Sequence, residues 1–512
     1  MGVAAAPPPP PSAALVTLAC GVRPAALGIL SAEPLWPGSR TFLVRLPGGA
    51  TPDAVRRLRA RRGVVAVEPD RVRRRVAPAA TAPGQGDPLR RLQPHLVQIR
   101  WTPPARRAVR PLVAVLDTGV DPRTPDLRGR LDLARARSFA PGTGGALVDR
   151  EGHGTHVAGI IAAVSDNGVG VSGVAAARIL PVKIADQAGN ATTSSLVRGI
   201  RYAIARRARI VNVSFGGDGR SALEQAAIDD AVRAGALVVA AAGNSGRLGS
   251  PREYPGAYRH VLAVGAVDGS GRPLPTSTRG PQVALAAPGL EVLSTAPSRS
   301  GGAPGYAVRS GTSMAAAVVS GVAARIWAAR PRLRASQVAA LLTGSARDVG
   351  APGWDVETGA GVVDLAAALG RPAPPADTAE PNDEPSQAAR TRPLLPGGGT
   401  AAARVVGRLS PWSDPRDGYR VALAAGDALE VELQEPAGAD LDLVLWRPGA
   451  RRFTPDPGAV RALVAGSAVG PARGPAISLV APATGVYTLE VRAVRGGGVY
   501  RLAARRTTPA AG

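Results

Sequence analysis

Three residues whose types could together cleave an acyl bond stand far apart in the chain: Asp117, His153 and Ser313. A serine hydroxyl is a weak nucleophile until a base takes its proton, and a carboxylate is needed to orient the imidazole that serves as the base. Each of the three residues stands where the sequence pattern predicts that a strand or helix begins or ends. The sequence therefore predicts hydrolysis by an activated serine.

The elements that must position these side chains follow from the apolar pattern. Asp117 ends the short run from Leu112, which is typical of a buried parallel strand. His153 follows Gly152 and opens an apolar helical segment. Ser313 precedes three turns of small or apolar residues and should lie at the N-terminus of a buried helix, where backbone N–H groups and the helix dipole favour negative charge. An ordinary helix-capping serine is the alternative explanation of Ser313 taken alone.

Three motifs carry a resemblance to a known family. Asp-Thr-Gly at 117–119, His-Gly-Thr-His at 153–156 and Gly-Thr-Ser-Met-Ala at 311–315 occur in this order. Together they resemble the subtilisin-like serine proteases, the subtilase family. The resemblance implies a serine endopeptidase that hydrolyses protein substrates by a Ser-His-Asp triad through an acyl-enzyme. Ala317 stands where the family usually has proline, and alanine suits a helix well enough for the exchange to be tolerated.

The same resemblance implies further site residues. Asn244 matches the asparagine that binds the oxyanion alongside the Ser313 N–H, although Gly-Asn is also a common turn pair. Ser214, Phe215 and Gly216 match a segment that pairs with the backbone of an extended substrate. The expected partner is therefore a polypeptide.

Glu253 stands where the family often has glycine, at the floor of the pocket for the residue before the scissile bond. A carboxylate there should favour Arg or Lys in the substrate. Alternatively, Glu253 turns to solvent or pairs with Arg252, which would leave an apolar preference.

A structural calcium ion is the expected cofactor, and no organic cofactor is expected. The resemblance implies ligands from the side chains of Asp126 and Asn167 and from the carbonyls of Val169 and Val171. A plain Asx turn at Asn167 is the alternative. His95 and His156 are expected to be structural.

Composition narrows the function. The 512-residue chain has a formal net charge of +24, but nearly all of its basic residues are arginines scattered along the chain, and Lys183 is its only lysine. Aromatic residues are scarce, so no nucleic-acid partner is expected. No membrane span is visible, Cys20 is the sole cysteine, and we expect a monomer. The resemblance suggests a secreted protein, although residues 1–39 make a poor export signal.

The expected organisation has six parts. Residues 1–39 are an N-terminal segment with a possible export signal, 40–76 an inhibitory propeptide that blocks the cleft, and 77–86 a processing linker. Residues 87–370 alternate strands and helices, which predicts an α/β catalytic domain with a doubly wound, mainly parallel sheet. After a linker at 371–399, the period of two over 400–507 predicts a β-sandwich resembling the bacterial pre-peptidase C-terminal domain.

Two other functions stay open. A catalytically silent binding protein could use the same fold, but it would usually have lost a triad residue. A soluble intracellular protease is the nearer alternative. The sequence favours a self-processed and secreted serine endopeptidase.

Overall fold

The computed structural model divides into two compact units, residues 1–331 with 342–370 and residues 332–341 with 371–512. The residues that it describes are 13–27, 32–46, 49–75, 89–105, 109–142, 144–298, 305–375, 382, 385–389, 391–410, 414–436, 439–450, 453, 463–466, 475–495 and 497–509. The expected processing linker at 77–86 lies outside these residues.

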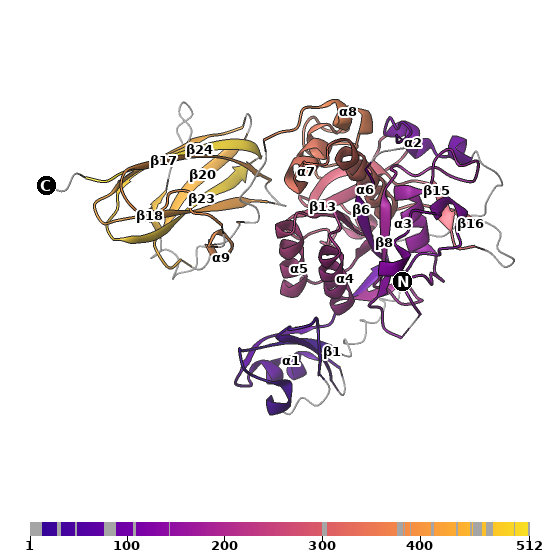
Figure 1. Ribbon diagram of the computed structural model, residues 1–512, viewed down its shortest axis with the longest axis horizontal. Coiled ribbons are helices and arrows are strands. Elements are labelled where there is room, and N and C mark those ends of the chain that lie inside the picture. The colour runs from indigo at the N-terminus through magenta and orange to yellow at the C-terminus, as the bar shows by residue number, and fades with distance from the viewer. Residues whose placement is uncertain are drawn as a thin grey trace. The chain divides into compact units, whose positions relative to one another are not determined.

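A small α+β module forms the N-terminal part of the first unit (Figure 1). Its antiparallel sheet has the order β2-β3-β1-β4, and one helix, α1, covers it. The elements are β1 (Ala13–Leu18), β2 (Ala32–Pro34), β3 (Thr41–Arg45), α1 (Pro52–Arg59) and β4 (Val64–Pro69). Thr51 caps the helix by accepting a hydrogen bond from Ala54 N–H.

This module corrects the expected boundary at residue 40. The apolar run at Ala13–Leu18 is a central strand, paired with both β3 and β4, and it is almost fully buried. It is therefore part of the folded module, and not only part of a leading segment. A short apolar run near an N-terminus has the same composition as a signal peptide, which is why the sequence alone did not separate the two.

A seven-stranded parallel sheet forms the centre of the first unit and confirms the predicted α/β fold class. Its strand order is β14-β13-β12-β10-β6-β8-β7, and all neighbouring strands are parallel. The strands are β6 (Leu112–Asp117), β7 (Arg137–Ser138), β8 (Arg178–Lys183), β10 (Ile210–Val213), β12 (Leu237–Ala241), β13 (Val261–Val267) and β14 (Val283–Pro288).

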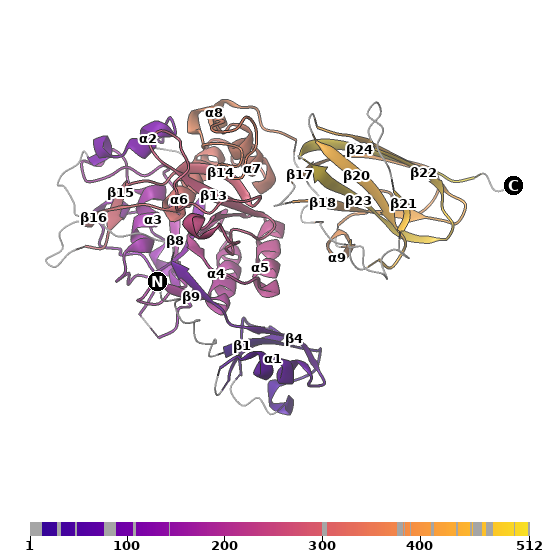
Figure 2. The same cartoon turned by 180° about the vertical axis from the view of Figure 1, so that it is seen from behind.

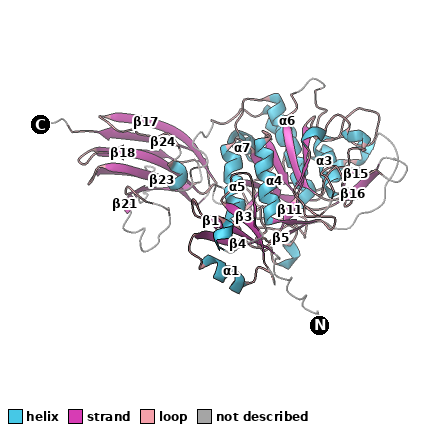
Figure 3. Cartoon of the chain, turned by 60° about the horizontal axis from the view of Figure 1, so that its bottom comes forward, coloured by secondary structure: helices cyan, strands magenta, loops and turns pink. Residues whose placement is uncertain are grey.

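Helices cover both faces of this sheet, α4 and α5 on one and α3 and α6 on the other (Figure 3). Right-handed crossovers produce this arrangement, because the chain moves one way along the sheet from β6 to β8 and the other way from β8 to β12. Besides α1, the α-helices in the described residues are α2 (Pro94–Gln98), α3 (His153–Ala162), α4 (Thr193–Ala205), α5 (Ala222–Arg233), α6 (Thr312–Ala329), α7 (Ala335–Gly344), α8 (Leu365–Gly370) and α9 (Pro385–Ala388).

Helix α6 is the only helix in the described ranges that is long and apolar enough to cross a membrane. Its first sixteen residues are buried in the first unit. It is thus a core helix, which fits its nearly uniform small and apolar sequence.

Two small sheets complete the first unit. β15 (Val292–Ala296) and β16 (Gly305–Arg309) form an antiparallel pair that contacts α3. β5 (Val72–Arg75) lies between β9 (Asn190–Thr192) and β11 (Phe215–Gly216) and is antiparallel to both. Through β5, the chain that leaves the N-terminal module joins a sheet with two segments of the α/β part.

The second unit contains two four-stranded antiparallel sheets around one apolar core, as predicted (Figure 2). Inward Leu429, Val431 and Leu433 alternate with outward Glu430 and Glu432. The sheets have the orders β17-β24-β19-β22 and β18-β23-β20-β21. Their strands are β17 (Ala401–Leu409), β18 (Arg416–Leu423), β19 (Ala428–Gln434), β20 (Asp440–Trp446), β21 (Leu463–Gly466), β22 (Ala476–Val480), β23 (Gly485–Arg495) and β24 (Gly498–Thr507).

Candidate active site

Asp117 and His153 meet where β6 ends and α3 begins. The His153 Nδ1 atom lies 2.8 Å from Asp117 Oδ1, and both side chains are buried. Asp117 Oδ1 also accepts a hydrogen bond of 2.8 Å from the Thr118 N–H, which fixes the carboxylate against its own backbone. Gly152 precedes the helix with φ 87°, a conformation that favours glycine and that turns the chain sharply into α3.

Ser313 is the second residue of α6, which begins at Thr312 after the N-cap residue Gly311. Gly311 has φ 135° and no side chain with which to cap α6. In this rotamer the Ser313 hydroxyl donates to the carbonyl of Ser214 at 3.1 Å. The Ser214 hydroxyl in turn donates to the Ser313 carbonyl, also at 3.1 Å. The nucleophile candidate is therefore tied to the end of β10.

The second ring nitrogen of His153, Nε2, is buried and has no hydrogen-bond partner among the described residues. The ring packs edge-on against Phe215, with 6.0 Å between centroids. Because Nδ1 is engaged by Asp117, Nε2 is the atom that can exchange a proton with a hydroxyl. The structure thus brings Asp117 and His153 into contact, whereas no hydrogen bond joins His153 Nε2 to Ser313, and the triad remains a prediction.

Asn244 follows β12 and lies beside the start of α6. Its Oδ1 atom accepts hydrogen bonds from the Thr312 N–H at 3.1 Å and from the Thr312 hydroxyl at 2.9 Å. Since the amide oxygen is held by these donors, the Nδ2 group is the part of the amide that can donate to a substrate. Thr312 was missed as a functional residue, although its place directly before Ser313 was visible in the sequence.

Gly216 and Phe215 form β11 and pair with β5, as the substrate-strand prediction requires. Phe215 lies opposite Arg75 and Gly216 opposite Arg74, while Arg74 also pairs with Asn190 on β9. A peptide that continued the pairing of β5 with β11 by one residue would lie opposite Ser214. The Ser214 carbonyl accepts the Ser313 hydroxyl. The site thus accommodates a polypeptide strand that leads to Ser313.

Glu253 is buried behind the turn that carries Asn244. Its Oε1 atom accepts hydrogen bonds from the Thr278 hydroxyl at 2.7 Å and from the Ser245 N–H at 3.2 Å. Only 8% of the residue is exposed, whereas Arg252 is exposed. The carboxylate therefore does not turn to solvent, which was one of the two alternatives.

Two of the four predicted calcium ligands, Asp126 and Asn167, accept hydrogen bonds from protein groups. Asp126 is fully buried, and its two carboxylate oxygens accept hydrogen bonds from the Val171 N–H and the Tyr306 hydroxyl at 3.2 and 2.7 Å. Val171 thus contacts Asp126 through its N–H. Asn167 is exposed, and its Oδ1 accepts the Val169 N–H at 2.8 Å in an Asx turn.

Protein groups hold the neighbouring loop as well. Arg90 Nη1 lies 2.5 Å from Asp166 Oδ1, and Gly170 O accepts the Leu89 N–H. Within the described part of the chain no group of three or more His, Cys, Asp or Glu residues could hold a metal ion. Calcium needs six to eight oxygen ligands, so further oxygens would have to join those of the four predicted residues, and the calcium site remains a prediction.

Of the three other histidines of the catalytic region, His95, His156 and His260, the first two are structural, as expected. Burial lowers the pKa of His95 to about 3. Burial also lowers the pKa of His156 well below its ordinary value, and its Nε2 lies 3.0 Å from the carbonyls of Val292 and Ala307. Both rings are therefore neutral at pH 7.

The comparisons with known proteins agree with this geometry. The model of the subtilase family matches residues 110–361. Subtilisin DY of Bacillus licheniformis is 40% identical over 242 residues, which cover 46% of this chain and 84% of that protein. Subtilisin E of Bacillus subtilis is 39% identical over 241 residues, 46% of this chain and 61% of that protein.

A cell wall-associated protease of Bacillus subtilis is 36% identical over 239 residues, which cover 46% of this chain and 26% of that protein. The matched stretch thus spans less than two thirds of this protease and of subtilisin E, and more than two thirds of subtilisin DY. Residues 110–361, which the family model matches, contain Asp117, His153, Asn244 and Ser313. The chain belongs to the subtilase family and is a serine endopeptidase.

Proposed function

We propose that the chain hydrolyses peptide bonds of protein substrates with Ser313 as nucleophile, His153 as general base and acid, and Asp117 as the group that orients the imidazole. Ser313 Oγ attacks the scissile carbonyl while His153 Nε2 takes its proton. The same nitrogen then returns the proton to the leaving amine, and water releases the acyl group by the reverse sequence. The observation that carries this proposal is the buried contact of 2.8 Å between His153 Nδ1 and Asp117 Oδ1, beside the N-terminus of α6.

Asn244 and the Ser313 N–H would stabilise the oxyanion. The bonds from Thr312 hold the Asn244 amide before substrate arrives, so little reorganisation is needed when charge develops. The N-terminus of α6 adds a favourable dipole at the same place.

The test compares the parent protein with Ser313→Ala and the matched control Ser310→Ala. Ser310 lies three residues upstream, and its hydroxyl accepts the Glu291 N–H at 2.8 Å. The parent and the control should hydrolyse casein and lose that activity with a serine-directed covalent inhibitor, whereas Ser313→Ala should be inactive. No hydrolysis by the parent would favour the silent binding protein, whereas inhibitor-insensitive hydrolysis would contradict Ser313 as the nucleophile.

We further infer that the N-terminal module is an inhibitory propeptide of a self-processed zymogen. Strand β5 occupies the peptide-binding position between β9 and β11, so a substrate strand cannot pair there at the same time. After processing, the module should remain bound until it is released or degraded. In a protease-free host, Ser313→Ala should accumulate as the full-length chain, and normal maturation of this variant would exclude self-cleavage.

Export is the localisation that we propose for the mature enzyme, which would act on protein substrates as a monomer outside the cell. The family includes a protease whose name places it at the cell wall. Fractionation of the native cell should find the processed enzyme in the medium or the cell wall. Recovery only from the cytosol would favour the intracellular alternative.

A further inference from the structure

Asp149 is a buried carboxylate next to the proposed triad, and the mechanism above does not use it. Only 5% of the residue is exposed. Its Oδ1 atom accepts the Gly152 N–H and the Thr118 hydroxyl, each at 2.8 Å. Its Oδ2 atom accepts the Thr155 N–H at 2.8 Å and the Thr155 hydroxyl at 2.6 Å. Four donors from two elements therefore converge on one side chain.

The first donor element is the N-terminus of α3. A helix begins with N–H groups that lack helical partners, and Gly152 has no side chain to cap them. Asp149 accepts the N–H groups of Gly152 and Thr155, on either side of His153. The intervening N–H groups of His153 and Gly154 donate to Glu151 Oε2 at 2.8 Å and Thr118 Oγ1 at 3.0 Å. Asp149 thus sets the position of the turn that carries the imidazole.

The second donor element is the end of β6. Thr118 follows Asp117, its N–H holds the Asp117 carboxylate, and its hydroxyl donates to Asp149. The approach of α3 to β6 is close, because a Cβ at position 154 would lie 2.1 Å from the Gly119 carbonyl oxygen. Asp149 therefore fixes the two ends between which the contact of Asp117 with His153 is made.

Lys183, the only lysine among 62 basic residues, supports the loop that carries Asp149. It ends β8, pairs in register with Asp117, and is 1% exposed. Its Nζ atom donates to the Val148 carbonyl at 2.8 Å. Burial lowers the pKa of Lys183 and raises that of Asp149, and the charge of Asp149 acts against the first of these effects. The ammonium thus anchors the backbone beside Asp149 and offsets part of its buried charge.

We propose that Asp149 is a positioning residue of the active site, which holds His153 against Asp117 with Lys183 as its anchor. This inference rests on the proposed triad. An ordinary helix cap is the alternative, and the two differ in what they predict. A helix cap contributes to stability alone, whereas a positioning residue also determines turnover per folded active site.

The experiment uses the full chain with Asp149→Asn and, as a matched control, Asp268→Asn. Asp268 also accepts backbone N–H groups, from Ser270 and Arg272, but in an exposed loop. Titration with a serine-directed covalent inhibitor counts the active sites, and kcat and KM are then measured per titrated site over pH 5 to 10. The parent must first show inhibitor-sensitive turnover, so that failure of the proposed triad is seen before Asp149 is tested.

We expect Asp149→Asn to lower kcat roughly 10- to 100-fold with KM within about twofold, because an amide replaces one acceptor oxygen with a donor and displaces the α3 turn. The acid limb of the pH profile of kcat/KM should move as well, since the imidazolium would lose its fixed contact with Asp117. Asp268→Asn should leave kcat and the acid limb of the pH profile unchanged. Parent-like kcat and pH profile in Asp149→Asn, with only a lower Tm, would overturn the proposal.

Thr118→Val keeps the inference testable if Asp149→Asn does not fold. This variant removes the hydroxyl that joins Asp149 to Gly154 and retains the shape of the side chain. Thr118→Val should also lower kcat. A parent-like kcat per titrated site in this variant would show that the hydrogen bonds of Thr118 and Asp149 do not position His153.

Discussion

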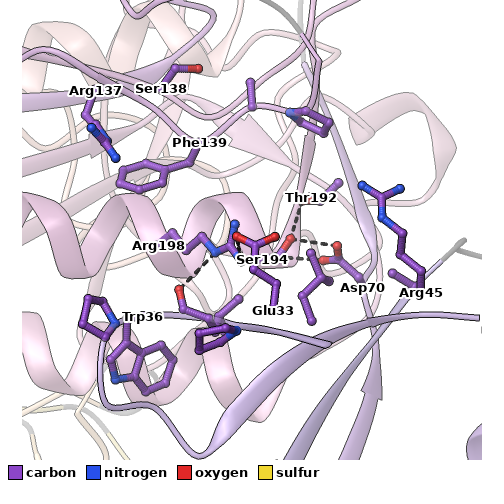
Figure 4. Close-up of a pocket in the computed structure, with 17 residues that line it drawn as sticks. Glu33, Trp36, Arg45, Asp70, Arg137, Ser138, Phe139, Thr192, Ser194 and Arg198 are labelled. Atoms are coloured by element: carbon purple, nitrogen blue, oxygen red, sulfur yellow. Dashed lines mark hydrogen bonds and ion pairs between the residues drawn. The ribbon is translucent and has the colours of Figure 1, made fainter. Parts of the chain in front are cut away.

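We expect Asp70 to make the affinity of the N-terminal module for the enzyme depend on pH. It follows β4, and its two carboxylate oxygens accept the N–H and the hydroxyl of Ser194 in the first turn of α4, both at 2.7 Å (Figure 4). Burial, which outweighs these hydrogen bonds, raises the pKa of Asp70 from 3.8 to about 6. A cavity of about 600 Å³ beside this contact lets water reach the carboxyl group.

The direction and the size of this pH dependence follow from the linkage between protonation of Asp70 and binding of the N-terminal module. A carboxyl whose pKa is raised in the complex favours the bound state when protonated, so the favourable contribution is complete below about pH 4 and is lost as pH rises through 6. The two pKa values differ by about 2, which corresponds to a loss of affinity of roughly 100-fold between pH 4 and pH 8. Burial also raises the pKa of Glu68, which bonds the hydroxyl of Ser221 at the start of α5, and this adds to the trend.

The assay dilutes the self-processed, non-covalent complex at pH 5 and pH 8 and measures activity recovered per titrated active site. The parent complex should dissociate at higher protein concentration at pH 8. Asp70→Asn, which resembles the protonated carboxyl at every pH, should bind tightly at both values. Asp53→Asn, on the exposed face of α1, should behave as the parent does. Tighter binding at pH 8 in the parent, or an unchanged pH dependence in Asp70→Asn, would refute the reasoning.

Three further predictions concern the catalytic unit. Asn244→Ala should lower kcat roughly 10²- to 10³-fold with little change in KM, a magnitude that comes from this family of enzymes, and a smaller effect would remove Asn244 from the oxyanion site. A chelator should lower the Tm, because calcium at the predicted site would bind only the folded state, and an unchanged Tm in chelator would remove the calcium site. Glu253→Gly should reduce the preference for Arg over Phe before the cleaved bond, as measured with two matched peptides, and an unchanged ratio would place Glu253 outside the pocket.

Local sequence patterns determined much of the fold. The run that ends at Asp117 and the uniformly apolar segment after Ser313 became a buried strand end and a core helix, because burial on all sides leaves no polar alternation. The positions of Asp117, His153 and Ser313 followed from the rule that parallel strands present their carboxyl ends at one edge. The β-sandwich followed from the period of two around Leu429.

The rest depended on contacts between distant segments, which no local pattern reveals. Asp126 accepts a hydrogen bond from Tyr306, 180 residues away, a contact that the sequence around Asp126 does not indicate. Asp149 lacks an apolar or capping pattern of its own. It accepts hydrogen bonds from Gly152, the N-cap residue of α3, and from Thr118, 31 residues earlier, which follows β6. The strand at Ala13–Leu18 is identified by its pairing with β3 and β4, and not by its composition.

The covalent adduct of a serine-directed inhibitor identifies the nucleophile of the proposed triad most directly. The processed parent enzyme is treated, digested and analysed by mass spectrometry, with His153→Ala treated in parallel. We predict one adduct, on Ser313, that forms with loss of activity in the parent and at least 10³-fold more slowly in His153→Ala, because the hydroxyl then has no base. Labelling of another residue, or equal labelling of Ser313 in both proteins, would contradict the proposed triad.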